Sequence, residues 1–158
     1  MIDRIRPYGE VLAVLFSGIT FGMFHGNFYQ FFYACAIGIT LAFIYIRTKN
    51  ILFPIILHCL FNSTSVLGQA LINGMENKSL PEFANILYTV GYYALTVALL
   101  AFTILGIIIF IKSIKKIHFV KNVYQIPKNK AFLYSSINVG MILFAVTVLV
   151  EFAASIFL

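Results

Sequence analysis

Two histidines and one asparagine lie in apolar stretches of the sequence. His25 ends the run Phe-Gly-Met-Phe-His that starts at Phe21, and His58 begins the run His-Cys-Leu-Phe-Asn that ends at Asn62. Each pair is four residues apart, so on a helix Phe21 lies beside His25 and His58 lies beside Asn62. Burying an imidazole or a carboxamide without a hydrogen-bonding partner is costly. Polar groups inside a membrane therefore usually pair with one another or take part in chemistry.

This set of side chains suits three kinds of activity. In hydrolysis, the imidazoles of His25 and His58 position or polarise a water, or bind a metal that does so, and the amide of Asn62 donates to a developing oxyanion. In a proton or ion path, the histidines relay charge. In the third case they only join neighbouring helices by hydrogen bonds. The spacing alone leaves all three open.

A metal site is not established by the sequence. His25 and His58 could ligate a divalent metal such as zinc, but catalytic zinc usually has three protein ligands. Asn62 is a poor zinc ligand, and the sequence contains no His-Glu-x-x-His helix.

The composition excludes a soluble domain. Of the 158 residues, 61% are hydrophobic and only 10% are charged, whereas soluble proteins are roughly half apolar and about a quarter charged. The net charge of +6 comes from basic residues at the ends of apolar runs. This placement indicates loops that face the cytoplasm and anionic lipid headgroups, and it argues against a nucleic-acid partner.

The length of the apolar runs predicts an all-α, polytopic transmembrane helical bundle with about five spans. We expect a single membrane domain over residues 1–158, with additional transmembrane helices in residues 66–158 beyond a core in residues 1–65. The expected spans cover residues 9–25, 28–46, 51–72, 84–111 and 131–158.

Loop charges predict the orientation of the chain. The turn at residues 47–49 is basic, and residues 112–130 carry six lysines, whereas residues 73–82 hold two glutamates and one lysine. The positive-inside rule then places the N-terminus in the cytoplasm and the C-terminus outside.

Two further features bear on the site. Gly18, Gly22 and Gly26 recur every four residues, a pattern that lets another helix approach closely. Glu151 lies deep in the last predicted span, and an acid inside a membrane is a functional candidate. Whether Glu151 reaches the histidine site stays open.

The order Phe21-x-x-x-His25, then His58-x-x-x-Asn62, resembles two motifs of the CPBP family, the CAAX-prenyl-protease and bacteriocin-processing (Abi) intramembrane proteases. The resemblance covers about residues 2–65 and includes the Tyr-Ile-Arg-Thr segment that ends at Thr48. It implies that His25 and His58 hold the attacking water or a metal and that Asn62 stabilises the oxyanion. Family substrates include prenylated C-termini in eukaryotes, and leader peptides or bacteriocin-immunity proteins in bacteria.

The Glu-Glu-x-x-x-Arg motif that supplies the family's base is absent from this sequence, and Glu10 lacks the spacing to replace it. We therefore expect the C-terminal part of a CPBP-type endopeptidase, truncated or inactive. The alternatives are a non-catalytic membrane protein of the same fold, acting in bacteriocin immunity or partner binding, and a small proton-relay or transport protein. The resemblance implies a bacterial plasma membrane location. The expected partners are membrane lipid, a peptide or protein substrate, and upstream helices or a second copy completing the bundle.

Overall fold

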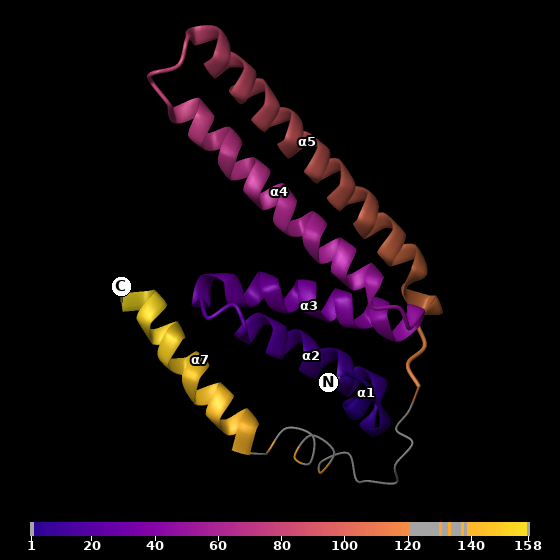
Figure 1. Ribbon diagram of the computed structural model, residues 1–158. Coiled ribbons are helices and arrows are strands. Elements are labelled where there is room, and N and C mark those ends of the chain that lie inside the picture. Colours follow the sequence, from indigo (N-terminus) through magenta and orange to yellow (C-terminus); the bar gives the residue numbers. More distant parts are fainter. Residues whose placement is uncertain (1, 121–129, 131–132, 134–136, 138, 158) are drawn as a thin grey trace. The chain divides into compact units, whose positions relative to one another are not determined.

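The computed structural model describes residues 2–120, 130, 133, 137 and 139–157, and the regular elements among them are all helical (Figure 1). This confirms the predicted all-α class. Short helical turns begin the chain, and longer apolar helices follow. The elements are α1 (Ile2–Ile5), η1 (Arg6–Tyr8), α2 (Glu10–Met23), α3 (Phe28–Thr48), α4 (Leu52–Glu76), α5 (Glu82–Ser113), η2 (Ile114–Lys116) and α7 (Val139–Phe157).

Among the residues that the structure describes, four helices, α3, α4, α5 and α7, are long and apolar enough to cross a membrane. The first expected span is shorter than predicted, because α2 has 14 residues and covers only about 21 Å at 1.5 Å per residue. Most of the first eight residues of the fifth expected span, 131–138, lie outside the described part of the chain, and the described helix begins at Val139.

The chain divides into two compact units. The first comprises residues 1–55 and 119–158, and the second comprises residues 56–118. The expected single membrane domain, with a family-like core ending at residue 65, stays a prediction.

In the first unit, α2 and α3 form a tight hairpin (Figure 1). A Cβ on Gly18 would lie 2.8 Å from the backbone nitrogen of Ile39, and a Cβ on Gly22 would lie 2.9 Å from the carbonyl oxygen of Phe31. The predicted close approach is thus confirmed for these two glycines. Gly26 instead lies in the turn between the helices, with φ at 60°, a backbone conformation that favours glycine.

The apolar core of this unit joins the chain start to the hairpin. Its buried members come from α1, α2 and α3, and Met141 of α7 packs against them. Because these side chains alternate at helical spacing, each helix buries one face and leaves the other for lipid. The buried residues are Ile5, Ala13, Val14, Phe16, Ala42 and Ile46.

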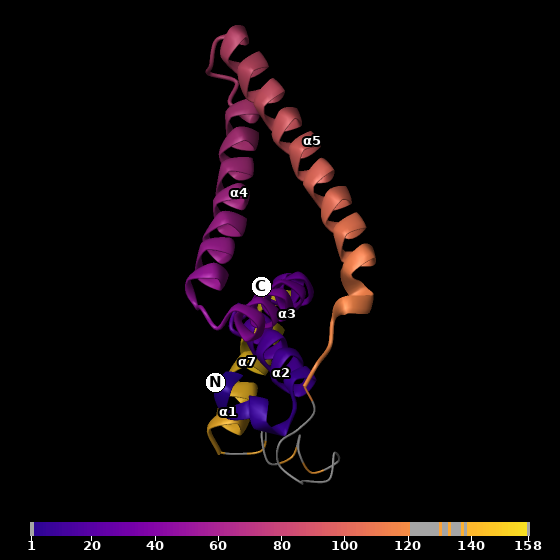
Figure 2. The ribbon, with the colours of Figure 1, turned by 90° about the vertical axis from the view of Figure 1, so that its right-hand side faces the viewer.

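The second unit is a hairpin of α4 and α5. The two arms contact each other near their connecting turn, where Gly74 packs against Tyr88 and Gly91 against Leu71. Away from this turn the arms diverge (Figure 2). No described residue of α5 is buried within the chain, as expected for a helix that is apolar on all sides and faces lipid or another helix.

Candidate active site

His25 lies in the turn directly after α2. Its Nδ1 is 2.9 Å from the carbonyl oxygen of Phe21, and its ring meets the Phe21 ring edge-on with 5.0 Å between the centroids. The predicted contact between these two residues is confirmed. Since a carbonyl oxygen only accepts, Nδ1 carries the proton of the neutral ring, and Nε2 holds the lone pair that can accept a proton or bind a metal.

The turn that carries His25 is fixed on both sides. The His25 N–H donates to the carbonyl of Gly22 at 3.2 Å, which tightens the end of α2. Asn27 begins α3, and its Oδ1 accepts from the backbone N–H groups of Tyr29 and Gln30 at 2.9 and 3.3 Å. This cap satisfies two of the otherwise unpaired N–H groups of the helix start. Hydrogen bonds on both sides of the turn therefore fix the position of the His25 backbone.

His58 and Asn62 lie one turn apart on α4. The Asn62 side-chain nitrogen is 3.1 Å from Nε2 of His58, which confirms the predicted pairing. When the amide donates, Nε2 accepts and the neutral His58 ring carries its proton on Nδ1. Pro54 lies in the first turn of α4, where its missing N–H breaks no helical hydrogen bond.

The structure assigns the three predicted site residues to two different units. His25 belongs to the first unit, and His58 and Asn62 belong to the second. Their convergence into one pocket stays a prediction, as do their catalytic roles.

Glu151 lies beside the turn that carries His25. Its carboxylate occupies the space that a Cβ on Gly26 would take. Four residues further along α7, the Ser155 hydroxyl accepts a hydrogen bond from the Phe28 N–H at 3.1 Å. The sequence marked Glu151 as an acid inside a span but gave no sign of which turn it approaches.

Sequence reasoning missed the burial of Glu10. Only 2% of this residue is exposed, and its Oε1 accepts from Arg6 Nη2 at 2.7 Å. Its Oε2 accepts from the Val120 N–H at 2.9 Å and lies 3.6 Å from Arg47 Nη1. The only sequence signal was the four-residue spacing of Arg6 and Glu10, which is typical of a helical ion pair.

These partners set the ionisation of Glu10, which lies at the start of α2 and outside the four candidate spans. Burial raises the pKa of its carboxyl. The hydrogen bond from Val120 and the bonds and charges of Arg6 and Arg47 outweigh burial, so the pKa lies below its usual value. Because the Glu10 carboxylate is bound to these partners, it stabilises the packing of this unit and is a poor proton acceptor for catalysis.

The donor set does not fit a typical catalytic zinc site. No group of three His, Cys, Asp or Glu residues comes together among the described residues. His25 and His58 supply two imidazoles, one fewer than the usual three protein ligands.

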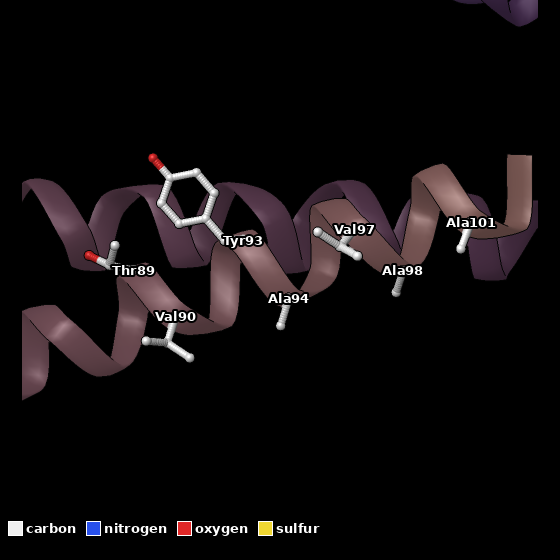
Figure 3. A pocket seen from close by; sticks show the side chains of 7 residues that line it. All are labelled: Thr89, Val90, Tyr93, Ala94, Val97, Ala98 and Ala101. Carbon is white, nitrogen blue, oxygen red and sulfur yellow. The ribbon is translucent and has the colours of Figure 1, made fainter.

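Two hollows in the described part of the chain are lined mainly by apolar side chains. One, of about 460 Å³, lies between α2 and α7 and is lined by residues such as Leu12, Met23 and Met141. The other, of about 620 Å³, follows one face of α5, and Tyr93 and Thr89 are its only polar side chains (Figure 3). Neither contains a histidine or an acid, so neither is the candidate active site.

The apolar helices define the class of protein. The chain is an integral membrane protein, because four helices in its described part are long and apolar enough to cross a membrane. Residues 1–64 match the family model "Type II CAAX prenyl endopeptidase Rce1-like". This match supports the assignment of residues 1–64 to the CPBP family of intramembrane proteases. No curated protein and no solved structure matches the chain.

Proposed function

We propose that this chain hydrolyses a peptide bond at or within the membrane, as an endopeptidase of the CPBP type. The observation that carries the proposal is that His25, His58 and Asn62 all fall within the 64 residues that match the prenyl endopeptidase model. Residues 66–158 add further transmembrane helices outside this match.

The local geometry supports a role for each side chain. Because Nδ1 of His25 is committed to the Phe21 carbonyl, its Nε2 is the nitrogen that holds and orients the attacking water. Asn62 has two N–H bonds on its side-chain nitrogen. One is directed at His58, and the other can donate to the oxyanion that forms when water adds to the scissile carbonyl.

The family model supports a proposal for the substrate class. We propose a peptide with a lipid-modified C-terminus, because the matched model is a CAAX prenyl endopeptidase, and a prenyl chain partitions into the same membrane that holds the site. A bacterial plasma membrane location, which the resemblance implies, is part of this proposal. A cytoplasmic N-terminus is also part of it, and the basic residues in segments 47–49 and 112–130 support that orientation. Lipid, the peptide substrate, and upstream helices or a second copy are the proposed partners.

The test uses the 158-residue chain reconstituted in phosphatidylcholine and phosphatidylglycerol vesicles. The probe is a peptide that ends in farnesylated Cys-Val-Ile-Met, a sequence type recognised for farnesylation. We expect mass spectrometry to detect loss of the last three residues, with His25→Ala and His58→Ala each abolishing the product. Cleavage that continues unchanged in both variants contradicts the assigned site.

Two alternatives make different predictions in the same vesicles. A non-catalytic protein, acting in bacteriocin immunity or partner binding, leaves the probe intact whether or not His25 is present. A proton-relay protein dissipates an imposed pH gradient, and His25→Ala slows this flux. A pH gradient that decays equally fast with the wild-type chain and with the His25→Ala variant argues against a proton relay.

A further inference from the structure

One acidic side chain lies in the interior of a candidate span. The chain has five acidic residues. Asp3 lies in α1, and Glu10 is the first residue of α2. Glu76 is the last residue of α4, and Glu82 is the first residue of α5. Only Glu151 is interior, about 18 Å from the start of α7 at 1.5 Å per residue. Such a residue is expensive to keep in a membrane and is therefore a functional candidate.

The face of α7 that carries Glu151 is the face that packs on the hairpin of α2 and α3. Phe144 lies two turns before Glu151, and its ring is 4.7 Å from that of Phe24. Ser155 lies one turn after it and accepts from the Phe28 N–H at 3.1 Å. Because residues spaced by four and seven share one side of a helix, these contacts direct Glu151 toward the hairpin.

The partner that Glu151 meets there is the turn of the histidine motif. Its carboxylate occupies the place of a Cβ on Gly26, the residue that follows His25 directly. In Figure 1 the C-terminal end of α7 lies beside this turn. Glu151 is nonetheless exposed on the surface of the chain, so its oxygens are not covered by the hairpin. A glycine at position 26 thus leaves room for an accessible carboxylate against the turn that carries His25.

We propose that Glu151 is a further catalytic residue, the proton acceptor for the attacking water. This inference depends on the proposed peptidase function. The Glu151 carboxylate takes a proton from water as the hydroxide oxygen bonds to the scissile carbonyl carbon. The oxyanion then collapses, the C–N bond breaks, and the carboxylic acid returns its proton to the leaving amine. The base is regenerated, and no further reactant is needed.

The experiment measures cleavage of the farnesylated probe by the full chain in vesicles. We expect Glu151→Gln and Glu151→Ala to lower the rate by about a hundredfold to ten-thousandfold. Glu76→Gln, which changes an exposed acid at the end of α4, is the matched control and leaves the rate unchanged. Glu151→Asp retains part of the activity because it keeps a carboxylate.

Chemical rescue separates a catalytic role from a structural one. Added sodium formate can replace a missing carboxylate base in the space left by Glu151→Ala, so we expect it to restore part of the rate. It should not rescue His25→Ala, which lacks an imidazole.

The outcomes distinguish the two proposals. If the unmodified chain cleaves the probe and Glu151→Gln cleaves it equally well, the role of Glu151 is wrong and the peptidase function stands. A Glu151→Ala variant that is inactive and gains nothing from formate also contradicts the proposal. If the unmodified chain fails to cleave the probe, the proposed function is wrong, and the role of Glu151 is wrong with it.

Discussion

The side-chain nitrogen of Asn62 lies 3.1 Å from Nε2 of His58, one helical turn away on α4. The amide therefore holds the imidazole in one orientation and in one tautomer while keeping a second N–H for a substrate oxygen. Two functions of one amide, orienting a ring and stabilising an oxyanion, can be tested by replacing it.

We predict that Asn62→Ala lowers kcat for peptide cleavage by about a hundredfold to a thousandfold, the usual loss when an oxyanion donor is removed. The rate of probe cleavage in vesicles is the measurement. Asn73→Ala is a matched control, because Gln69 donates to Asn73 at 2.9 Å across one turn of the same helix. That variant breaks a similar hydrogen bond elsewhere on α4 and should leave kcat unchanged.

The contact between Phe21 and His25 yields a second prediction. Edge-on aromatic pairs contribute about 0.5–1.5 kcal/mol beyond their buried area, so Phe21→Ala should let the His25 ring reorient. We expect cleavage to slow by roughly twofold to tenfold, with the affinity for the probe little changed. Phe32→Ala, which removes an exposed ring on α3, is the comparison. Equal losses in both variants would mean that general packing, and not the orientation of His25, is affected.

The close contact of α2 and α3 predicts opposite effects for two glycine substitutions. At Gly18, a Cβ would lie 2.8 Å from a backbone nitrogen of Ile39, which cannot move aside as a side chain can. Gly18→Ala should therefore destabilise the protein by about 1–3 kcal/mol. Gly68 on α4 has nothing within 4 Å of a Cβ, so Gly68→Ala should stabilise it by about 0.5–1 kcal/mol. Unfolding in mixed micelles, followed by circular dichroism, measures both, and a loss of stability in both variants would refute the steric explanation.

The buried carboxylate of Glu10 predicts how stability depends on pH. Its folded pKa is lower than the ordinary value of 4.5, so folding favours the ionised form. Its contribution is complete well above pH 4.5 and is lost as the pH falls from there through the lowered pKa. The free energy of unfolding of the wild type should therefore fall as the pH is lowered through this range.

The variant Glu10→Gln removes that dependence. Arg6 and Arg47 lose their counter-charge, but their side chains are 35% and 34% exposed and can be hydrated, so we expect a cost of about 1–3 kcal/mol. We expect a lower free energy of unfolding at pH 7 and a flatter profile below pH 4.5. Glu82→Gln, at the exposed start of α5, should change neither. A profile for Glu10→Gln as steep as that of the wild type would show that other carboxyls control acid unfolding.

Much of the architecture could be predicted from the sequence because it depends on local spacing. The long apolar runs determine α3, α4, α5 and α7, since a helix that crosses lipid must satisfy its backbone internally and needs about 20 apolar residues. The four-residue spacings likewise place Phe21 beside His25, and Asn62 beside His58, wherever the helices lie.

Only the tertiary structure decided which distant residues meet. Glu10 joins Val120, 110 positions further along the chain, and Glu151 packs against Gly26. No periodicity encodes these contacts, because they depend on how helix faces pack after the turns between them have formed. The shortened α2 has the same origin, since the turn at residues 24–27 ends the helix even though the apolar pattern continues. Spacing thus determined the helices and the local pairs of His25 and His58. Packing determined that Glu10 meets Val120 and that Glu151 meets Gly26.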